Sequence, residues 1–152
     1  FQILGSEFLE NDVEIKIVID EHTNSICSIH DSTSFSSTIQ NVMVDIDLNL
    51  TLPEFSDLQT VGNYVFINGG VKGIIVYRQD FNTYKTYDRN CSFEPSLTCA
   101  KIDSVNSSIA ICKCCDSMFL LGQNGETIDG PALLPLKQYQ NNLSGDFLYI
   151  YN

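Results

Sequence analysis

The fold class follows first from an alternating segment, residues 42–52, which reads Val42-Met43-Val44-Asp45-Ile46-Asp47-Leu48-Asn49-Leu50-Thr51-Leu52. Every second residue from Val42 to Leu52 is apolar, and four of the five residues between them are polar. Successive side chains of a strand point to opposite faces, so this period of two predicts a strand with one buried face and one solvated face.

Other short apolar segments, separated by turn residues, extend the β pattern along the chain. They cover residues 13–20, 64–67, 73–78, 81–87, 108–112, 118–121 and 147–151. The segments 64–67 and 73–78 are separated by Asn68-Gly69-Gly70, a signal typical of a hairpin. A polar stretch over residues 31–38 is expected to be a loop. Together these features predict an all-β fold, an antiparallel sandwich or barrel.

The length of the chain limits the number of domains, and its net charge limits the kinds of partner it can bind. The chain has 152 residues, enough for one domain, which we expect over residues 41–152 with a β extension over residues 1–40. Lys and Arg total 8 against 19 Asp and Glu, giving a net charge of −11. This balance argues against nucleic acid and anionic lipid surfaces as partners. No apolar run reaches the roughly 20 residues of a membrane-spanning helix.

Six cysteines suggest either disulfides in an oxidising compartment or a metal site. The stretch Cys112-Lys113-Cys114-Cys115 contains a C-x-x-C pair, the spacing of a metal-binding knuckle. With Cys91 and Cys99 it would complete a four-thiolate site for zinc or an iron–sulfur centre. Two disulfides are the alternative. Cys27 is expected to be a small buried apolar side chain.

The segment from Cys91 to Tyr139, about a third of the chain, resembles the cluster-binding part of Rieske proteins. The family pattern is C-x-H, then C-P-C-H-G-S, an aromatic strand, and a G-P-A-x-x-P-L loop. The matching stretches here are Cys91-Ser92-Phe93, Cys112-Lys113-Cys114-Cys115-Asp116-Ser117, Met118-Phe119-Leu120-Leu121 and Gly130-Pro131-Ala132-Leu133-Leu134-Pro135-Leu136. Tyr87-Asp88-Arg89 is also similar to envelope-associated Rieske-like proteins of the Bacteroidetes. The resemblance implies a β base with a small cysteine-bearing subdomain at about residues 88–121.

The resemblance also implies that the cluster ligands are degenerate. It assigns the two thiolate positions to Cys91 and Cys112, and the two histidine positions to Phe93 and Cys115. Ser117 matches the serine that donates a hydrogen bond to the cluster. Phenylalanine has no lone pair for iron, so the two-histidine half of a Rieske centre cannot form. The family's disulfide falls near Cys99 and Cys114, and a second disulfide between Cys91 and Cys115 would replace the cluster with a covalent link.

The function expected from these features is that of a non-enzymatic structural or interaction protein of the bacterial cell envelope, without a cofactor. It would be secreted, periplasmic or outer-membrane-associated, and would bind an envelope protein. A lipid anchor upstream of Phe1 stays an open alternative. The rival hypotheses are an electron-transfer protein with a modified 2Fe-2S cluster and a Cys-ligated zinc site. Both would use Cys91, Cys112 and Cys115, with Cys99 as a further candidate ligand. A thiol–disulfide switch at Cys112 and Cys115 is a third hypothesis.

Overall fold

The computed structural model describes residues 3–9, 13–19, 26–28 and 39–152, with side chains described from residue 39 onward. The chain divides into two compact units, Phe1–Ser36 and Ser37–Asn152. The first unit contains an antiparallel sheet of order β1-β2-β3, formed by β1 (Ile3–Leu9), β2 (Val13–Ile19) and β3 (Ile26–Ser28). The expected loop over residues 31–38 and the Cys27 side chain lie outside the described part.

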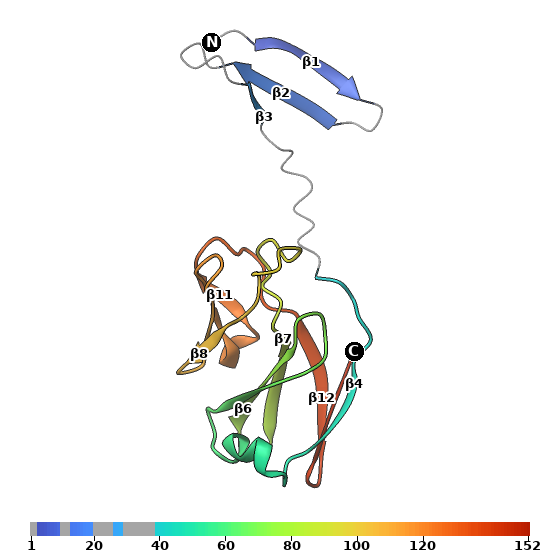
Figure 1. The fold of residues 1–152 in the computed structure, drawn as a ribbon, viewed down its shortest axis with the longest axis vertical. Coiled ribbons are helices and arrows are strands. Elements are labelled where there is room, and N and C mark those ends of the chain that lie inside the picture. Colours follow the sequence, from blue (N-terminus) through green and yellow to red (C-terminus); the bar gives the residue numbers. More distant parts are fainter. Residues whose placement is uncertain (1–2, 10–12, 20–25, 29–38) are drawn as a thin grey trace. The chain divides into compact units, whose positions relative to one another are not determined.

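The second unit is built on a six-stranded antiparallel sheet, which we call the base (Figure 1). Its strand order is β4-β13-β12-β7-β6-β5. The strands are β4 (Asp45–Asn49), β5 (Tyr64–Ile67), β6 (Ile74–Asp80), β7 (Thr83–Asp88), β12 (Gln138–Ser144) and β13 (Phe147–Tyr151). The strand predicted over residues 42–52 is confirmed in a shorter form, with Val44, Leu48 and Leu50 buried and Asp45 and Asp47 exposed.

The predicted hairpin is confirmed, because Tyr64–Ile67 pairs antiparallel with the start of β6. Two elements of the base were not predicted from the sequence. One is a 3₁₀ helix, η1 (Pro53–Gln59), which begins at a proline and buries Phe55 and Leu58. The other is β12, whose side chains are mostly polar and of which only Tyr139 is fully buried.

A smaller four-stranded sheet, the cysteine sheet, carries most of the cysteine region. Its order is β11-β10-β9-β8, and its strands are β8 (Ser104–Asn106), β9 (Ile109–Cys112), β10 (Ser117–Leu120) and β11 (Glu126–Asp129). A short 3₁₀ turn, η2 (Leu121–Gln123), joins β10 to β11. The sheet therefore continues to Asp129, beyond the subdomain expected at about residues 88–121. The expected all-β class, with an antiparallel base and a smaller cysteine-bearing part, is confirmed.

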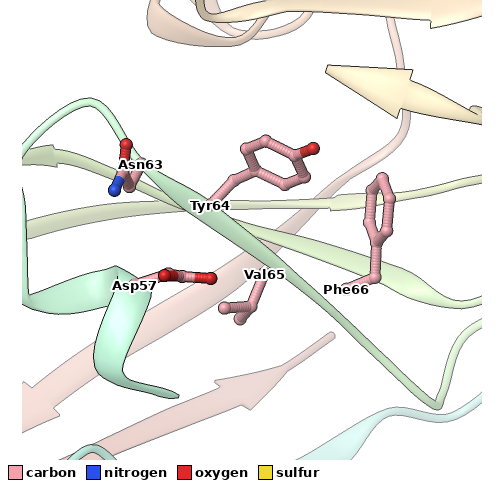
Figure 2. A pocket seen from close by; sticks show the side chains of 5 residues that line it. All are labelled: Asp57, Asn63, Tyr64, Val65 and Phe66. Atoms are coloured by element: carbon pink, nitrogen blue, oxygen red, sulfur yellow. The ribbon is translucent and has the colours of Figure 1, made fainter. Parts of the chain in front are cut away.

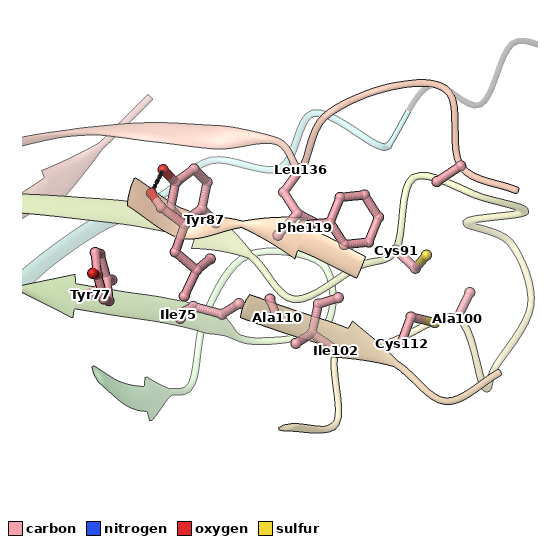
Figure 3. Packing of buried hydrophobic residues seen from close by; sticks show 12 residues of the cluster. Ile75, Tyr77, Tyr87, Cys91, Ala100, Ile102, Ala110, Cys112, Phe119 and Leu136 are labelled. Atoms are coloured by element: carbon pink, nitrogen blue, oxygen red, sulfur yellow. Dashed lines mark hydrogen bonds between the residues drawn. The ribbon is translucent and has the colours of Figure 1, made fainter. Parts of the chain in front are cut away.

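Strand β6 is buried on both faces and separates two apolar cores. Ile74 and Val76 belong to the core of the base. Ile75 and Tyr77 belong to a second core between the base and the cysteine sheet (Figure 3). A strand covered on both sides needs a continuous apolar run rather than an alternating one, which explains the stretch Ile74–Tyr77. No helix among the described residues is long and apolar enough to cross a membrane.

Candidate functional site

Three cysteines from two loops converge at one end of the second core. Figure 3 shows two of them, Cys91 and Cys112. Cys91 begins the loop of residues 91–100, which a bridge between Asn90 and Lys101 closes at its base. Cys112 ends β9, and Cys115 lies in the tight turn that leads to β10. We call Cys91, Cys112 and Cys115 the cysteine centre. Backbone pairing of Cys112 with Ser117 holds the ends of the tight turn together.

The three sulfur atoms lie close enough to share one ion. All three Sγ atoms are within 4.8 Å of one another, and Cys91 Sγ lies 3.6 Å from Cys115 Sγ. In a tetrahedral site with zinc–sulfur bonds of about 2.3 Å, two sulfurs are about 3.8 Å apart. The observed spacing therefore suits a mononuclear thiolate site, and no sulfur of the centre is bonded to another.

The centre is buried on one side and partly open on the other. Cys91 and Cys112 are fully buried, and burial is the largest cause that raises the pKa of both thiols. Cys115 is half-exposed. Burial also acts to raise its pKa, but hydrogen bonds from the Ser117 hydroxyl and backbone outweigh this effect, so the pKa is lowered. Cys115 is therefore the thiol most easily ionised and reached from solvent.

A disulfide between Cys99 and Cys114 lies beside the centre, with a Cα–Cα distance of 5.5 Å. It ties the loop of residues 91–100 to the tight turn after β9. Cys99 was a candidate metal ligand, and this is corrected, because a sulfur in a disulfide is not a thiolate. The alternative disulfide between Cys91 and Cys115 is not formed in the structure, where both are free thiols.

Ser117 connects the centre to a third loop, residues 130–136. Ser117 Oγ lies 3.1 Å from Cys115 Sγ and accepts a hydrogen bond of 3.1 Å from the Ala132 backbone N–H. The loop approaches so closely that a Cβ on Gly130, where φ is +92°, would lie 2.4 Å from the Ser117 Cα. The loop is also bound to the first one, since Ser92 Oγ donates to the Leu134 carbonyl at 2.6 Å.

Two charged residues, Lys72 and Asp88, support the loops, a role that was not predicted from the sequence. Lys72 Nζ donates hydrogen bonds to three carbonyls of the first loop, those of Pro95, Leu97 and Ala100. Burial lowers the pKa of Lys72, and the nearby Cys112 and Cys91 act to raise it. A lone lysine after a Gly-Gly turn gives no sequence signal for this role.

Asp88 is fully buried at the end of β7 and holds the turn before β6 and the segment before Cys91. Its carboxylate accepts hydrogen bonds from the backbone N–H groups of Val71 and Asn90 at 2.6 and 2.7 Å, and from the Tyr139 hydroxyl at 2.7 Å. Burial and this contact raise the pKa of Tyr139. Asp88 thereby links the base directly to the residue that precedes Cys91.

A histidine-ligated 2Fe-2S cluster does not fit the residues present. Phe93, at the family's first histidine position, is half-buried and packs against the second core. Its side chain offers no ligand atom. Within residues 39–152 the centre provides three thiolates and no imidazole.

A shallow pocket elsewhere in the second unit is lined by Asp57, Asn63, Tyr64, Val65 and Phe66 (Figure 2). The Tyr64 and Phe66 rings lie 5.1 Å apart, and the Arg89 guanidinium stacks 3.8 Å from the Phe66 ring centre. No cysteine lines this pocket. Its side chains include one carboxylate and no partner base or nucleophile, so the cysteine centre is the stronger candidate site.

The comparisons with known proteins find similarity to solved structures alone. No protein-family model matches the chain, and no curated protein matches it. One similar solved structure is a chain from the complex of reduced oxygenase and oxidized ferredoxin in carbazole 1,9a-dioxygenase. The identity is 13%, the match covers 74% of this chain and 94% of that chain, and the TM-score is 0.48. This similarity does not assign the chain to a family.

Proposed function

We propose that residues 37–152 form a non-enzymatic metal-binding domain, Rieske-like in its motifs, whose cysteine centre holds one zinc ion. The observation that carries the proposal is that five neighbouring cysteines differ in their bonding. Two of them, Cys99 and Cys114, form a disulfide, whereas three others, in mutual reach, stay reduced. Conditions that oxidise the exposed pair would also join adjacent free thiols, unless an ion holds them as thiolates.

The donor set supports zinc over the modified iron–sulfur cluster. Thiolates select soft or borderline ions, and zinc forms stable sites with several cysteines. A 2Fe-2S cluster needs four protein ligands, and the described cysteine centre supplies three. The fourth zinc position would take water or a ligand from outside this centre.

The lack of general acid–base groups supports a non-enzymatic role. Among the residues that the structure describes, Ser117 is the only side chain outside the centre within hydrogen-bond distance of its sulfurs. A hydroxyl held by the Ala132 N–H is a poor proton-transfer group at neutral pH. A zinc ion in this setting would fix the two cysteine loops in place.

We further propose that the domain works in the bacterial cell envelope through a protein partner. The exposed disulfide supports an oxidising compartment. Exposed apolar side chains on the loops around the centre support a partner contact, namely Leu97, Leu133 and Leu134. Cell fractionation followed by crosslinking in the native host tests both points.

Metal analysis of anaerobically purified, untagged protein tests the proposal. We expect about one zinc ion per chain, and nearly none in the Cys112→Ser variant. The Lys85→Met variant, which changes an exposed lysine in contact with Asn124, should keep its zinc. Two irons with acid-labile sulfide would instead support the electron carrier, and metal-free protein would support the cofactor-free structural role.

A further inference from the structure

We propose that the cysteine centre is a peroxide-responsive switch, in which oxidation joins Cys91 to Cys115 and releases the metal ion. This inference rests on the proposed function, since it names the regulation of the same site. It is carried by the spacing and the unequal exposure of the three sulfurs.

The sulfur–sulfur contact between Cys91 and Cys115 points to the pair that reacts. Cys91 Sγ and Cys115 Sγ are 3.6 Å apart in the reduced protein. A disulfide bond is about 2.05 Å long, so its formation requires a shift of about 1.5 Å. Cys91 and Cys115 sit on different loops, and the disulfide between Cys99 and Cys114 already holds these loops together. The movement is therefore local and needs no rearrangement of the base.

The exposure selects the sulfur that is attacked first. Cys115 is half-exposed, whereas Cys91 and Cys112 are fully buried. A small oxidant such as hydrogen peroxide can therefore reach Cys115 from solvent, and Cys91 lies behind it as the resolving thiol. Ser117 Oγ, 3.1 Å from Cys115 Sγ, provides a polar neighbour for the oxidised sulfur.

The chemistry balances in two steps. The Cys115 thiolate attacks one peroxide oxygen, the O–O bond breaks, and a sulfenic acid forms with loss of hydroxide. The Cys91 thiolate then attacks the Cys115 sulfur, the S–O bond breaks, and a second hydroxide leaves. With two protons, the products are one disulfide and two waters. The two thiols supply the two electrons that reduce the peroxide, and the metal ion changes no oxidation state.

Loss of metal follows from the ligand count. A disulfide sulfur is not a thiolate, so the centre would fall from three anionic ligands to one, Cys112. A single thiolate cannot hold zinc against water and competing ligands at micromolar concentration. A thiol reductant would restore the three thiolates and allow reloading.

The test uses the full chain, purified with zinc and then treated with stoichiometric hydrogen peroxide. A chromogenic chelator measures released zinc, and mass spectrometry of alkylated peptides maps the disulfides. We expect about one zinc released per chain, two thiols lost, and a new link between Cys91 and Cys115. The Cys99–Cys114 link should be present before and after treatment.

Matched variants separate the steps. The Cys112→Ser variant lacks a metal ligand but keeps the reacting pair, so its metal-free form should still form the Cys91–Cys115 link. The Cys91→Ser variant should stop at oxidised Cys115 with no new disulfide.

The outcomes distinguish this inference from the proposed function. If the reduced protein carries no zinc, the proposed function fails, and the peptide map still reports whether the pair forms. If zinc is bound but peroxide links Cys112 to Cys115, or drives Cys115 to a sulfinic acid with no link, the switch is overturned and the metal site stands.

Discussion

Lys72 and Cys91 bind the same carbonyl oxygen. Lys72 Nζ donates to the Ala100 carbonyl at 2.9 Å, and the Cys91 backbone N–H donates to it at 3.0 Å. Because Lys72 also binds the carbonyls of Pro95 and Leu97, one ammonium fixes the loop that starts at a cysteine of the centre. The position of the Cys91 sulfur thus depends on a side chain from the hairpin turn of the base.

Replacing Lys72 with methionine should weaken zinc binding about tenfold, which is about 1.4 kcal/mol. It should also lower the free energy of unfolding by about 2 kcal/mol, the usual size for hydrogen bonds to a charged group. Chelator competition measures the first effect and urea unfolding the second. Lys72→Arg keeps the charge and should recover part of the affinity.

Lys85→Met is the control for Lys72, because its Nζ makes a single exposed contact, with Asn124. We expect a change in stability within about 0.5 kcal/mol for this variant. Equal zinc affinities in the Lys72→Met and Lys85→Met proteins would contradict a positioning role for Lys72.

Gly130→Ala should displace the third loop from Ser117 and lower zinc affinity. The added Cβ would lie 2.4 Å from the Ser117 Cα and 2.9 Å from its backbone nitrogen, and backbone atoms cannot rotate away. Gly62→Ala is a closely matched control, since its φ of +89° is similar to the +92° of Gly130 but nothing lies within 4 Å. Both variants place alanine at a similar positive φ, so the difference in chelator competition reports mainly the clash.

Phe93→His should provide a fourth ligand and raise zinc affinity by at least about tenfold. Burial raises the pKa of the Cys91 thiol, and a hydrogen bond from the Phe93 backbone acts to lower it, so Phe93 begins beside the centre. Phe93→Leu keeps an apolar side chain against the second core and should leave affinity unchanged. If the two variants bind zinc equally, the family's ligand position does not correspond to Phe93.

Removal of the metal should lower the melting temperature. A ligand at a thousandfold excess over its dissociation constant stabilises the native state by about 4 kcal/mol. Differential scanning calorimetry with and without a strong chelator measures the shift. The Cys112→Ser protein should melt at one temperature in both conditions, and a chelator-dependent shift in that variant would place the ion elsewhere.

The sequence predicts two kinds of strand correctly: those with one solvent-exposed face and those with a continuous apolar run. Val44, Leu48 and Leu50 follow a clear period of two, and Ile74 to Tyr77 form an apolar block. Strand β12 was not predicted, because its exposed face carries glutamine and asparagine and only Tyr139 marks its buried side. Its β conformation comes from pairing with β13, which follows it directly in a hairpin, and with β7, which lies far away along the chain.

The candidate site could be predicted only in part. Residue spacing pointed to Cys91, Cys112 and Cys115, but it also offered Cys99 as a ligand. Which cysteines form a disulfide depends on how the loop of residues 91–100 and the turn after β9 are oriented in space. The spacing of cysteines along the sequence does not give that orientation. Lys72 was missed because it acts on backbone carbonyls, whose positions no motif records, and Asp88 was noted only as part of Tyr87-Asp88-Arg89, without its structural role.

Strand β6 couples the unfolding of the two apolar cores, because its two faces belong to different cores. Ile74 and Val76 fill one side, while Ile75 and Tyr77 fill the side that reaches Cys91 and Cys112. Separating the cysteine sheet from the base would expose the face of β6 that carries Ile75 and Tyr77. The base and the cysteine sheet are therefore expected to unfold together in one cooperative transition. A change at the three sulfurs would then alter side-chain packing in the core of the base as well.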